Sequence, residues 1–246
     1  MHDDLYTEMA ALEDRFWWFV AKRNILLNLI GRYAPARKPG EKGLAIDLGC
    51  GSGGLLRRLK DSFPTLGVEM NEHAREICAE HGLTVKPGWL PDDVPAEDAS
   101  ADVIVMSDVL EHVEKDVETV KVAAQKLRPG GILVCTVPAH PWMWTKRDEH
   151  HNHFRRYTRD QYERMFDIPE LAAVVESYYN SFLFPPMVAA RLLGKVLKKD
   201  TEAGDIRVPP GPVNGAMRRV FECEKQILGK LRLPIGASLI SVHRRV

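Results

Sequence analysis

The sequence of 246 residues has no excess charge of either sign, because 34 lysine and arginine residues balance 34 aspartate and glutamate residues. Without a basic excess, no long-range field attracts nucleic acid, so we expect no nucleic-acid partner. The chain also lacks an apolar run long enough to span a bilayer and lacks a recognisable signal peptide. We therefore expect a cytoplasmic monomer or homodimer without a transmembrane span, for which peripheral membrane contact stays an alternative.

Cysteine is also scarce. The four cysteines, at positions 50, 78, 135 and 223, lie far apart and have no metal-like spacing. This pattern excludes a disulfide framework and agrees with a reducing compartment. No internal repeat or low-complexity tract interrupts the chain, and 45% of its residues are hydrophobic, enough for one large α/β domain with additions.

Glycine, in contrast, is concentrated in residues 44–55, LAIDLGCGSGGL. An apolar strand cannot continue through Gly49, Gly51 and Gly53, so the chain must turn there and leave bare backbone for a close approach. The segment predicts a strand, a tight loop and the start of a helix. Unpaired N–H groups at a helix start suit a ligand with an electron-rich group.

Two ligand classes fit this loop. Gly49, Gly51 and Gly54 also have the spacing of a dinucleotide fingerprint, which keeps an NAD(P)-dependent oxidoreductase as an alternative. However, the carboxylate of Asp47 stands at the mouth of the loop, where it would repel a pyrophosphate and welcome a cation. S-adenosylmethionine carries an ammonium and a sulfonium, so we favour it. A module that binds this cofactor without turnover is a third interpretation.

A second acid follows the next expected strand. Glu69 comes directly after residues 65–68, and Asn71 has the position of an N-cap for a helix that runs to about Glu80. Ligands of open parallel sheets bind at the carboxyl ends of the strands. Asp47 and Glu69 should therefore face one crevice, where Glu69 can accept both ribose hydroxyls.

Four ordered motifs, DLGCGSG, GVEMN, ADVIVMSDVLEHV and LRPGGILVCTVP, resemble those of the class I S-adenosylmethionine-dependent methyltransferases. In that family the first two motifs hold the methionine and ribose parts, and the residues after the third strand flank the adenine, a position that Gly88, Trp89 and Leu90 occupy here. The resemblance implies cofactor contacts from Asp47, Gly49, Cys50, Gly51, Gly53, Glu69, Met70, Trp89, Leu90, Ser107, Asp108 and Val109.

Strand-like runs alternate with helical segments, which predicts an α/β fold with a mostly parallel sheet and helices on both faces. The expected strands are residues 44–47, 65–68, 84–86, 102–106, 132–137, 173–179 and 238–243. Resemblance to the family implies a Rossmann-like seven-stranded sheet with a reversed last strand. We expect one domain with an N-terminal helix (1–33), a cofactor-binding core (43–180), a helical insertion (181–234) and the last strand (235–246).

Three regions outside the four motifs should select the acceptor. The first, residues 1–33, has apolar residues at helical spacing and an aromatic run at 16–19, and it either covers the crevice as a lid or docks against the sheet. The second, residues 181–234, contains an apolar stretch with Pro185 and Pro186, a loop at 204–215 and an expected helix at 216–231. It forms either a cap over the acceptor or a contact with a second copy or a membrane surface.

The third region, residues 138–166, gathers histidines, arginines and aromatics where the sheet opens toward its ligand. It resembles a segment of some bacterial methyltransferases, an aspartate followed by Gly-His-x-Arg-Arg-Tyr, which is matched by Asp148, His153, Arg155, Arg156 and Tyr157, with Asn152 at the glycine position. Asparagine tolerates a positive φ, so this departure is mild.

Histidine suits removal of a proton near neutral pH, which makes His153 the first candidate for a general base, followed by His151 and His150. Arg155 or Arg156 could bind an anionic group of the acceptor. Alternatively, His153 and Tyr157 only brace the loop. Metal binding by His150, His151 and His153 is an alternative, but no acidic or cysteine ligand set completes it, so we expect no metal.

The motif SDVLEHV supplies a further candidate, because His112 follows Asp108 at the end of an expected strand beside the methyl donor. His112 is a second candidate base, although a histidine at a helix start often only packs or caps. The sequence therefore predicts transfer of a methyl group to oxygen or nitrogen of a small-molecule or lipid- or glycan-linked acceptor.

Overall fold

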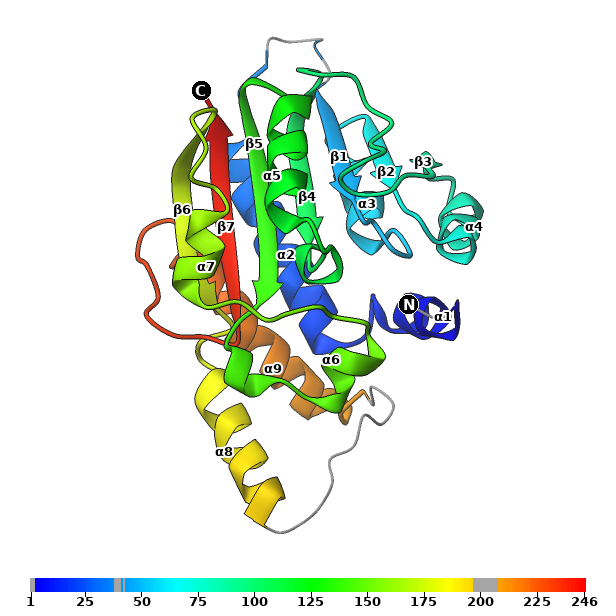
Figure 1. The fold of residues 1–246 in the computed structure, drawn as a ribbon. Helices are drawn as coiled ribbons and strands as arrows, with labels where there is room; N and C mark the ends of the chain where they lie inside the picture. The colour runs from blue at the N-terminus through cyan, green and yellow to red at the C-terminus, as the bar shows by residue number, and fades with distance from the viewer. Residues whose placement is uncertain (1–2, 38–40, 42, 197–207) are drawn as a thin grey trace.

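The computed structural model describes residues 3–37, 41, 43–196 and 208–246, with side chains left out at 193–196. Its centre is a seven-stranded sheet of order β3-β2-β1-β4-β5-β7-β6 (Figure 1). Strand β7 runs antiparallel to β5 and β6 on its two sides, and the other neighbouring strands pair in parallel. The strands are β1 (Leu44–Leu48), β2 (Thr65–Val68), β3 (Val85–Lys86), β4 (Ala101–Ser107), β5 (Leu127–Pro138), β6 (Leu171–Tyr179) and β7 (Ser238–Arg245). The predicted Rossmann-like fold with a reversed last strand is confirmed.

Helices cover both faces of this sheet. They are α1 (Asp3–Leu12), α2 (Trp17–Tyr33), α3 (Gly54–Leu59), α4 (Glu72–Glu80), α5 (Asp116–Lys126), α6 (Lys146–His150), α7 (Arg159–Arg164), α8 (Phe184–Val196) and α9 (Gly211–Glu222). Short 3₁₀ turns occupy Leu110–His112, Pro141–Met143 and Cys223–Gln226. In the described part of the chain, no helix is both long and apolar enough to cross a membrane.

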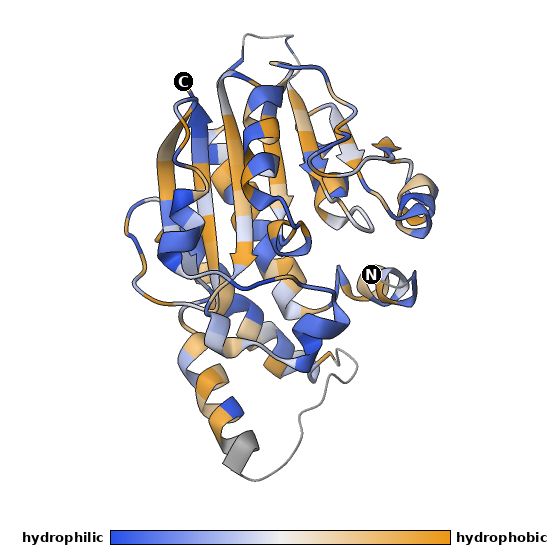
Figure 2. Cartoon of the chain, in the orientation of Figure 1, coloured by the Kyte–Doolittle hydropathy of each residue, from blue (hydrophilic) through white to orange (hydrophobic). Residues whose placement is uncertain are grey.

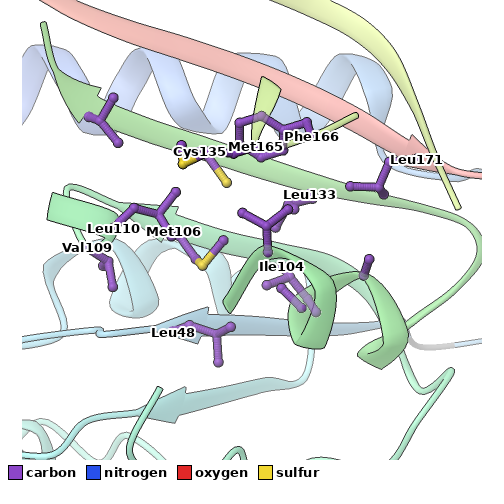
Figure 3. Packing of buried hydrophobic residues seen from close by; sticks show 14 of the residues in the cluster. Leu48, Ile104, Met106, Val109, Leu110, Leu133, Cys135, Met165, Phe166 and Leu171 are labelled. Carbon is purple, nitrogen blue, oxygen red and sulfur yellow. The ribbon is translucent and has the colours of Figure 1, made fainter. Parts of the chain in front are cut away.

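Two hydrophobic clusters hold these layers together. Ile104 and Met106 of β4 belong to one cluster, which Phe166 covers after α7 (Figure 3), whereas Val103 and Val105 belong to the other. Successive residues of a strand point to opposite faces, so a strand covered on both sides must be apolar throughout. This explains why every residue of β4 before Ser107 is buried and why all of them except Asp102 are apolar.

The second cluster is built by α2 and α9. Ile25 and Leu29 of α2 are fully buried against the sheet, and Phe221 of α9 packs its ring 6.0 Å from that of Trp17. The part of the N-terminal region formed by α2 therefore docks on the sheet. The α1 helix instead lies beside α4, near the carboxyl ends of the parallel strands (Figure 1).

Some boundaries differ from the predicted ones. The helix expected at 216–231 begins at Gly211 and ends at Glu222. Pro212 suits the first turn, and the Asn214 side chain accepts a hydrogen bond from Trp17 N (3.0 Å) and donates one to Arg15 O (2.8 Å). These contacts with a distant segment fix the helix start. Strand β5 likewise begins early, because Leu127 pairs with Ala101 before the turn that contains Gly130.

The α8 helix extends away from the sheet, and much of its surface is apolar (Figures 1 and 2). Pro185 and Pro186 lie in its first turn, where a missing N–H costs little, so they start this helix rather than break it. Phe182, Met187 and Leu192 are exposed along this segment.

Candidate active site

The glycine-rich loop between β1 and α3 has the backbone that only glycine adopts readily. Gly49, Gly51 and Gly53 have φ values of 72°, 53° and 85°. A side-chain carbon at Gly49 would lie 2.7 Å from Val109 and one at Gly53 would lie 2.5 Å from Leu83, whereas at Gly51 nothing stands within 4 Å. Close packing thus fixes the two ends of the loop, and its centre leaves open space for a ligand.

Buried carboxylates surround this loop. Asp47 at the end of β1, Glu69 after β2 and Glu13 between α1 and α2 are all buried. Burial raises the pKa of Asp47 to about 7, and the charges of Glu69 and Glu13 add to this effect, although Lys22 opposes it. Buried carboxyl groups at this place would favour a cationic ligand, so the cofactor contact of Asp47 stays a prediction.

Glu69 is held in a defined orientation by the backbone. Its carboxylate accepts hydrogen bonds from Gly51 N and Asn71 N, both at 2.9 Å, and lies 3.4 Å from the hydroxyl of Tyr6 in α1. Asn71 caps α4 as predicted, because its side chain accepts a hydrogen bond from Ala74 N. Cys50 lies buried inside the loop. The two acids therefore stand at adjacent strand ends, on either side of the loop.

Sequence reasoning missed Glu13, which closes the loop from the N-terminal region. Its carboxylate accepts hydrogen bonds from Ser52 Oγ and, at 3.2 Å, from Gly54 N at the start of α3, and it pairs with Arg57 at 3.0 Å. The only signal for it was an acid within the interruption of the apolar pattern between α1 and α2.

Lys22 of α2 was not predicted either, because the sequence pattern of residues 1–33 is dominated by apolar residues at helical spacing. Its Nζ donates to Asp108 at 2.8 Å and lies 4.4 Å from the ring centre of Trp18. Burial would raise the pKa of Asp108, but Lys22 and a hydrogen bond from Thr136 outweigh it and hold the pKa below its usual value. Asp108 thus enters the crevice as a charged group, between Ser107 and the buried Val109.

The residues predicted near the adenine lie at the edge of the sheet beyond β3. Trp89 is 52% exposed and pairs through its backbone with Asp93. Met70 is 57% exposed after Glu69, and Leu90 is half-buried. Exposed aromatic and thioether groups beside the loop are free to cover a flat ring, so their role stays a prediction.

A second group of side chains gathers after β4. Glu111, His112 and His153 each place a potential ligand atom within 4.8 Å of the others. The rings of His112 and His153 are 4.6 Å apart and nearly perpendicular. The backbone N–H of Phe154 donates to Glu111 O at 2.7 Å, which ties the segment after α6 to the turn after β4.

Burial dominates the charge state of this cluster. It lowers the pKa of His112 to about 4, an effect to which His153 adds, so that His112 is neutral at pH 7. Burial also raises the pKa of Glu111 well above its usual value, and Oε2 of Glu111 has no hydrogen-bond partner. His151 is half-buried with a pKa lowered by burial to about 4, whereas His150 is exposed.

Asp148 organises the segment that carries His153. Its carboxylate lies 3.0 Å from His153 Nδ1, accepts from Nε and Nη2 of Arg156 at 2.8 and 3.1 Å, and caps α6 through Thr145. Asn152 has a φ of 56°, which agrees with the expected tolerance of asparagine at a glycine position. The segment is therefore a rigid hydrogen-bonded loop.

Arg155 and Tyr157 also contact the protein itself. Arg155 pairs with Asp116 at 2.7 Å, and the buried hydroxyl of Tyr157 lies within 3.0 Å of both Leu110 O and the Asp116 carboxylate. Because Arg155 and Arg156 are both engaged in ion pairs, an anion-binding role would require them to leave these partners. Bracing of the loop accounts for their contacts.

A family model described as a methyltransferase domain matches residues 20–176. The malonyl-[acyl-carrier protein] O-methyltransferase of Hahella chejuensis is 31% identical over 97 residues, 37% of this chain and 35% of that protein. The ubiquinone biosynthesis O-methyltransferase of Caulobacter vibrioides is 34% identical over 112 residues, 42% of this chain and 43% of that protein. The matched regions thus span less than half of these relatives.

Solved structures share the fold at low identity. An S-adenosylmethionine-dependent methyltransferase from Thermotoga maritima has a TM-score of 0.57 and 18% identity over the full length of both chains. Geranyl diphosphate methyltransferase in complex with S-adenosylmethionine has a TM-score of 0.56 and 15% identity, over 91% of this chain and 85% of that one. The family match sets aside the oxidoreductase alternative.

The matched residues include the glycine-rich loop, both acids at the strand ends and the turn after β4. The chain belongs to the methyltransferase-domain family, the class I methyltransferases that use S-adenosylmethionine.

Proposed function

We propose that this methyltransferase acts on a hydroxyl oxygen of a small-molecule or lipid- or glycan-linked acceptor. The observation that carries the proposal is the cluster of Glu111, His112 and His153, in which two residues of the turn after Asp108 meet an imidazole from the segment after α6. Both curated relatives are named as O-methyltransferases, which supports oxygen over nitrogen.

The loop residues fit the cofactor. The buried carboxylate of Asp47 suits its ammonium, the open backbone at Gly51 allows close approach, and Glu69 suits the ribose hydroxyls. We assign the remaining surroundings to Met70, Trp89, Leu90, Ser107, Asp108 and Val109. When bound, the cofactor supplies a methyl group on sulfur; the S–C bond breaks with its electron pair left on sulfur, and the carbon bonds to a lone pair of the acceptor.

The chain must align the acceptor and take up its proton. In the histidine-base mechanism, Asp148 holds Nδ1 of His153 and leaves Nε2 free to accept the hydroxyl proton. His112 lies against His153 and is neutral at pH 7, so it is the second candidate. His151 is a third, with its ring 5.9 Å from that of His153.

We also propose that α1 is a lid over the cofactor and that the α8 segment covers the acceptor. Tyr6 and Asp3 of α1 contact Glu69 and Asn71, the residues at the ribose side of the loop. The exposed apolar residues near α8 suit an acceptor with an apolar part.

Release of S-adenosylhomocysteine in the presence of hydroxyl, amine and thiol acceptors tests the function. We expect turnover with hydroxyl acceptors, reduced by about 10²- to 10⁴-fold in His153→Ala with cofactor affinity unchanged. His81→Ala, an exposed histidine at the end of α4, is the matched control. Cofactor binding without turnover on any acceptor would instead identify a binding module, and turnover restricted to amines would overturn the choice of oxygen.

A further inference from the structure

Two residues after β4 and one residue after α6 form a set of metal donors that the sequence did not predict. We propose that Glu111, His112 and His153 bind one divalent transition-metal ion. Their potential ligand atoms lie within 4.8 Å of one another, although His153 is distant from the other two in the chain. The sequence drew attention to His150, His151 and His153 and led us to expect no metal, whereas the structure brings His153 to Glu111 and His112.

Glu111 provides the strongest independent sign of a missing ligand. Its side chain is 1% exposed, and Oε2 has no hydrogen-bond partner. A buried carboxyl oxygen without a partner costs free energy, which a bound cation at this position would recover.

The orientation of the two histidines gives a second sign. His153 Nδ1 is 3.0 Å from the Asp148 carboxylate, and the His112 ring lies 4.6 Å from the His153 ring, nearly perpendicular to it. The His153 ring therefore has Nδ1 held by the protein and Nε2 left for the cluster. Metal-ligating histidines are held in this way, through a carboxylate or a backbone carbonyl on the other nitrogen.

The donor set indicates the class of metal. Two imidazoles and one carboxylate suit Zn²⁺, Fe²⁺ or Co²⁺, whereas Mg²⁺ and Ca²⁺ prefer oxygen ligands. Three protein ligands leave at least one coordination position for a water or substrate oxygen.

This inference rests on the proposed function and changes its proton step. A hydroxyl oxygen of the acceptor would occupy the open position, and the metal would lower the pKa of that hydroxyl so that its proton leaves to solvent. The oxygen lone pair then forms the bond to the methyl carbon. His153 would act as a ligand rather than as the base.

Metal binding can be measured without cofactor or acceptor. Protein treated with a chelator and dialysed is titrated with Zn²⁺ by calorimetry and with Co²⁺ by visible absorption. We expect one ion per chain, d–d absorption of nitrogen- and oxygen-coordinated Co²⁺, and a Zn²⁺-dependent rise in Tm. Glu111→Gln and His153→Ala should each weaken binding by at least about 100-fold, since outer partners alone contribute 10- to 100-fold.

The matched control is His81→Ala, which should bind as the wild type does. Circular dichroism of each variant without metal checks that it is folded. Equal binding by Glu111→Gln and wild type, or no binding of Zn²⁺ and Co²⁺ by wild type, would overturn the metal site. In that case, turnover of metal-free protein would still uphold the O-methyltransferase. Conversely, one bound ion with the expected losses but no hydroxyl turnover would uphold the site and reject the acceptor.

Discussion

Burial of the Asp47 carboxyl group makes the stability of the protein depend on pH. It is 3% exposed, and its pKa is raised by burial from 3.8 to about 7, with further contributions from Glu69 and Glu13. The folded state therefore holds a proton that the unfolded chain releases above about pH 4. Stability should fall as pH rises from about 4 to 7 and should change little from this residue above that range.

Asp47→Asn removes this cost, so we expect the variant to be more stable than the wild type at pH 8 by up to about 4 kcal/mol, and to differ little below pH 4. Urea unfolding at pH 4, 6 and 8 measures the difference. Calorimetry should show weaker binding of S-adenosylhomocysteine, because the ammonium loses its carboxylate. A stability difference independent of pH would show that Asp47 does not titrate in this way.

Glu69, unlike Asp47, accepts hydrogen bonds from two backbone N–H groups, those of Gly51 and Asn71. If the same carboxylate accepts the ribose hydroxyls, Glu69→Ala should weaken cofactor binding roughly 30- to 150-fold, about 2 to 3 kcal/mol. Calorimetry with S-adenosylhomocysteine measures this loss. Glu72→Ala, an exposed acid in the first turn of α4, should retain the affinity and serves as the control.

The two N-terminal helices, α1 and α2, have different surroundings. The α2 helix is part of the core, so its removal would unfold the layer, whereas only Leu5 and Tyr6 are buried in α1. We expect deletion of residues 1–12 to leave a folded chain from which S-adenosylhomocysteine dissociates about tenfold faster, because its enclosure is lost. Stopped-flow displacement measures the rate. An unchanged rate in a folded truncation would reject the lid.

Sequence patterns predicted the strands well because central parallel strands are apolar on both faces and their ends are marked by glycines or acids. Strand β2 was predicted at residues 65–68 and has those bounds. The start of α9 could not be predicted in this way, since it depends on bonds between Asn214 and the segment before α2. Local propensity carries no information about such distant partners.

In the candidate site, too, some residues could be predicted from local sequence and others depend on distant contacts. Asp47 and Glu69 were predictable because both directly follow strands that the topology places side by side. Lys22 and Glu13 come from helices, whose packing on the sheet sets which side chains reach the crevice. The proximity of Glu111 to His153 depends on the hydrogen bond from Phe154 N to Glu111 O, which joins two distant loops.

The residues predicted to bind the cofactor and the acceptor lie at the carboxyl edge of the sheet. A different ionic cluster, centred on Asp102, stabilises the opposite edge. Asp102 at the start of β4 is 1% exposed and accepts hydrogen bonds from Leu44 N at 2.9 Å, from Arg128 Nε at 2.6 Å and from Arg37 Nε at 2.8 Å. It therefore joins the segment after α2, the start of β1 and the start of β5.

This arrangement predicts that stability and cofactor binding can be changed separately. Burial would raise the pKa of Asp102, but the two arginines outweigh it and lower the pKa, so its contribution is present above about pH 4 and is lost as pH falls through the folded-state value. Asp102→Asn leaves both guanidinium groups without their carboxylate and should cost about 2 to 4 kcal/mol at pH 7, measured by urea unfolding.

The affinity of folded Asp102→Asn for S-adenosylhomocysteine should stay within about twofold of the wild type, because no ligand group at the carboxyl edge contacts Asp102 in the described structure. Asp98→Asn, an exposed acid that pairs with Lys126, is the control and should change stability by less than about 0.5 kcal/mol. A large loss of affinity in Asp102→Asn with little loss of stability would show that the two edges of the sheet are coupled rather than independent.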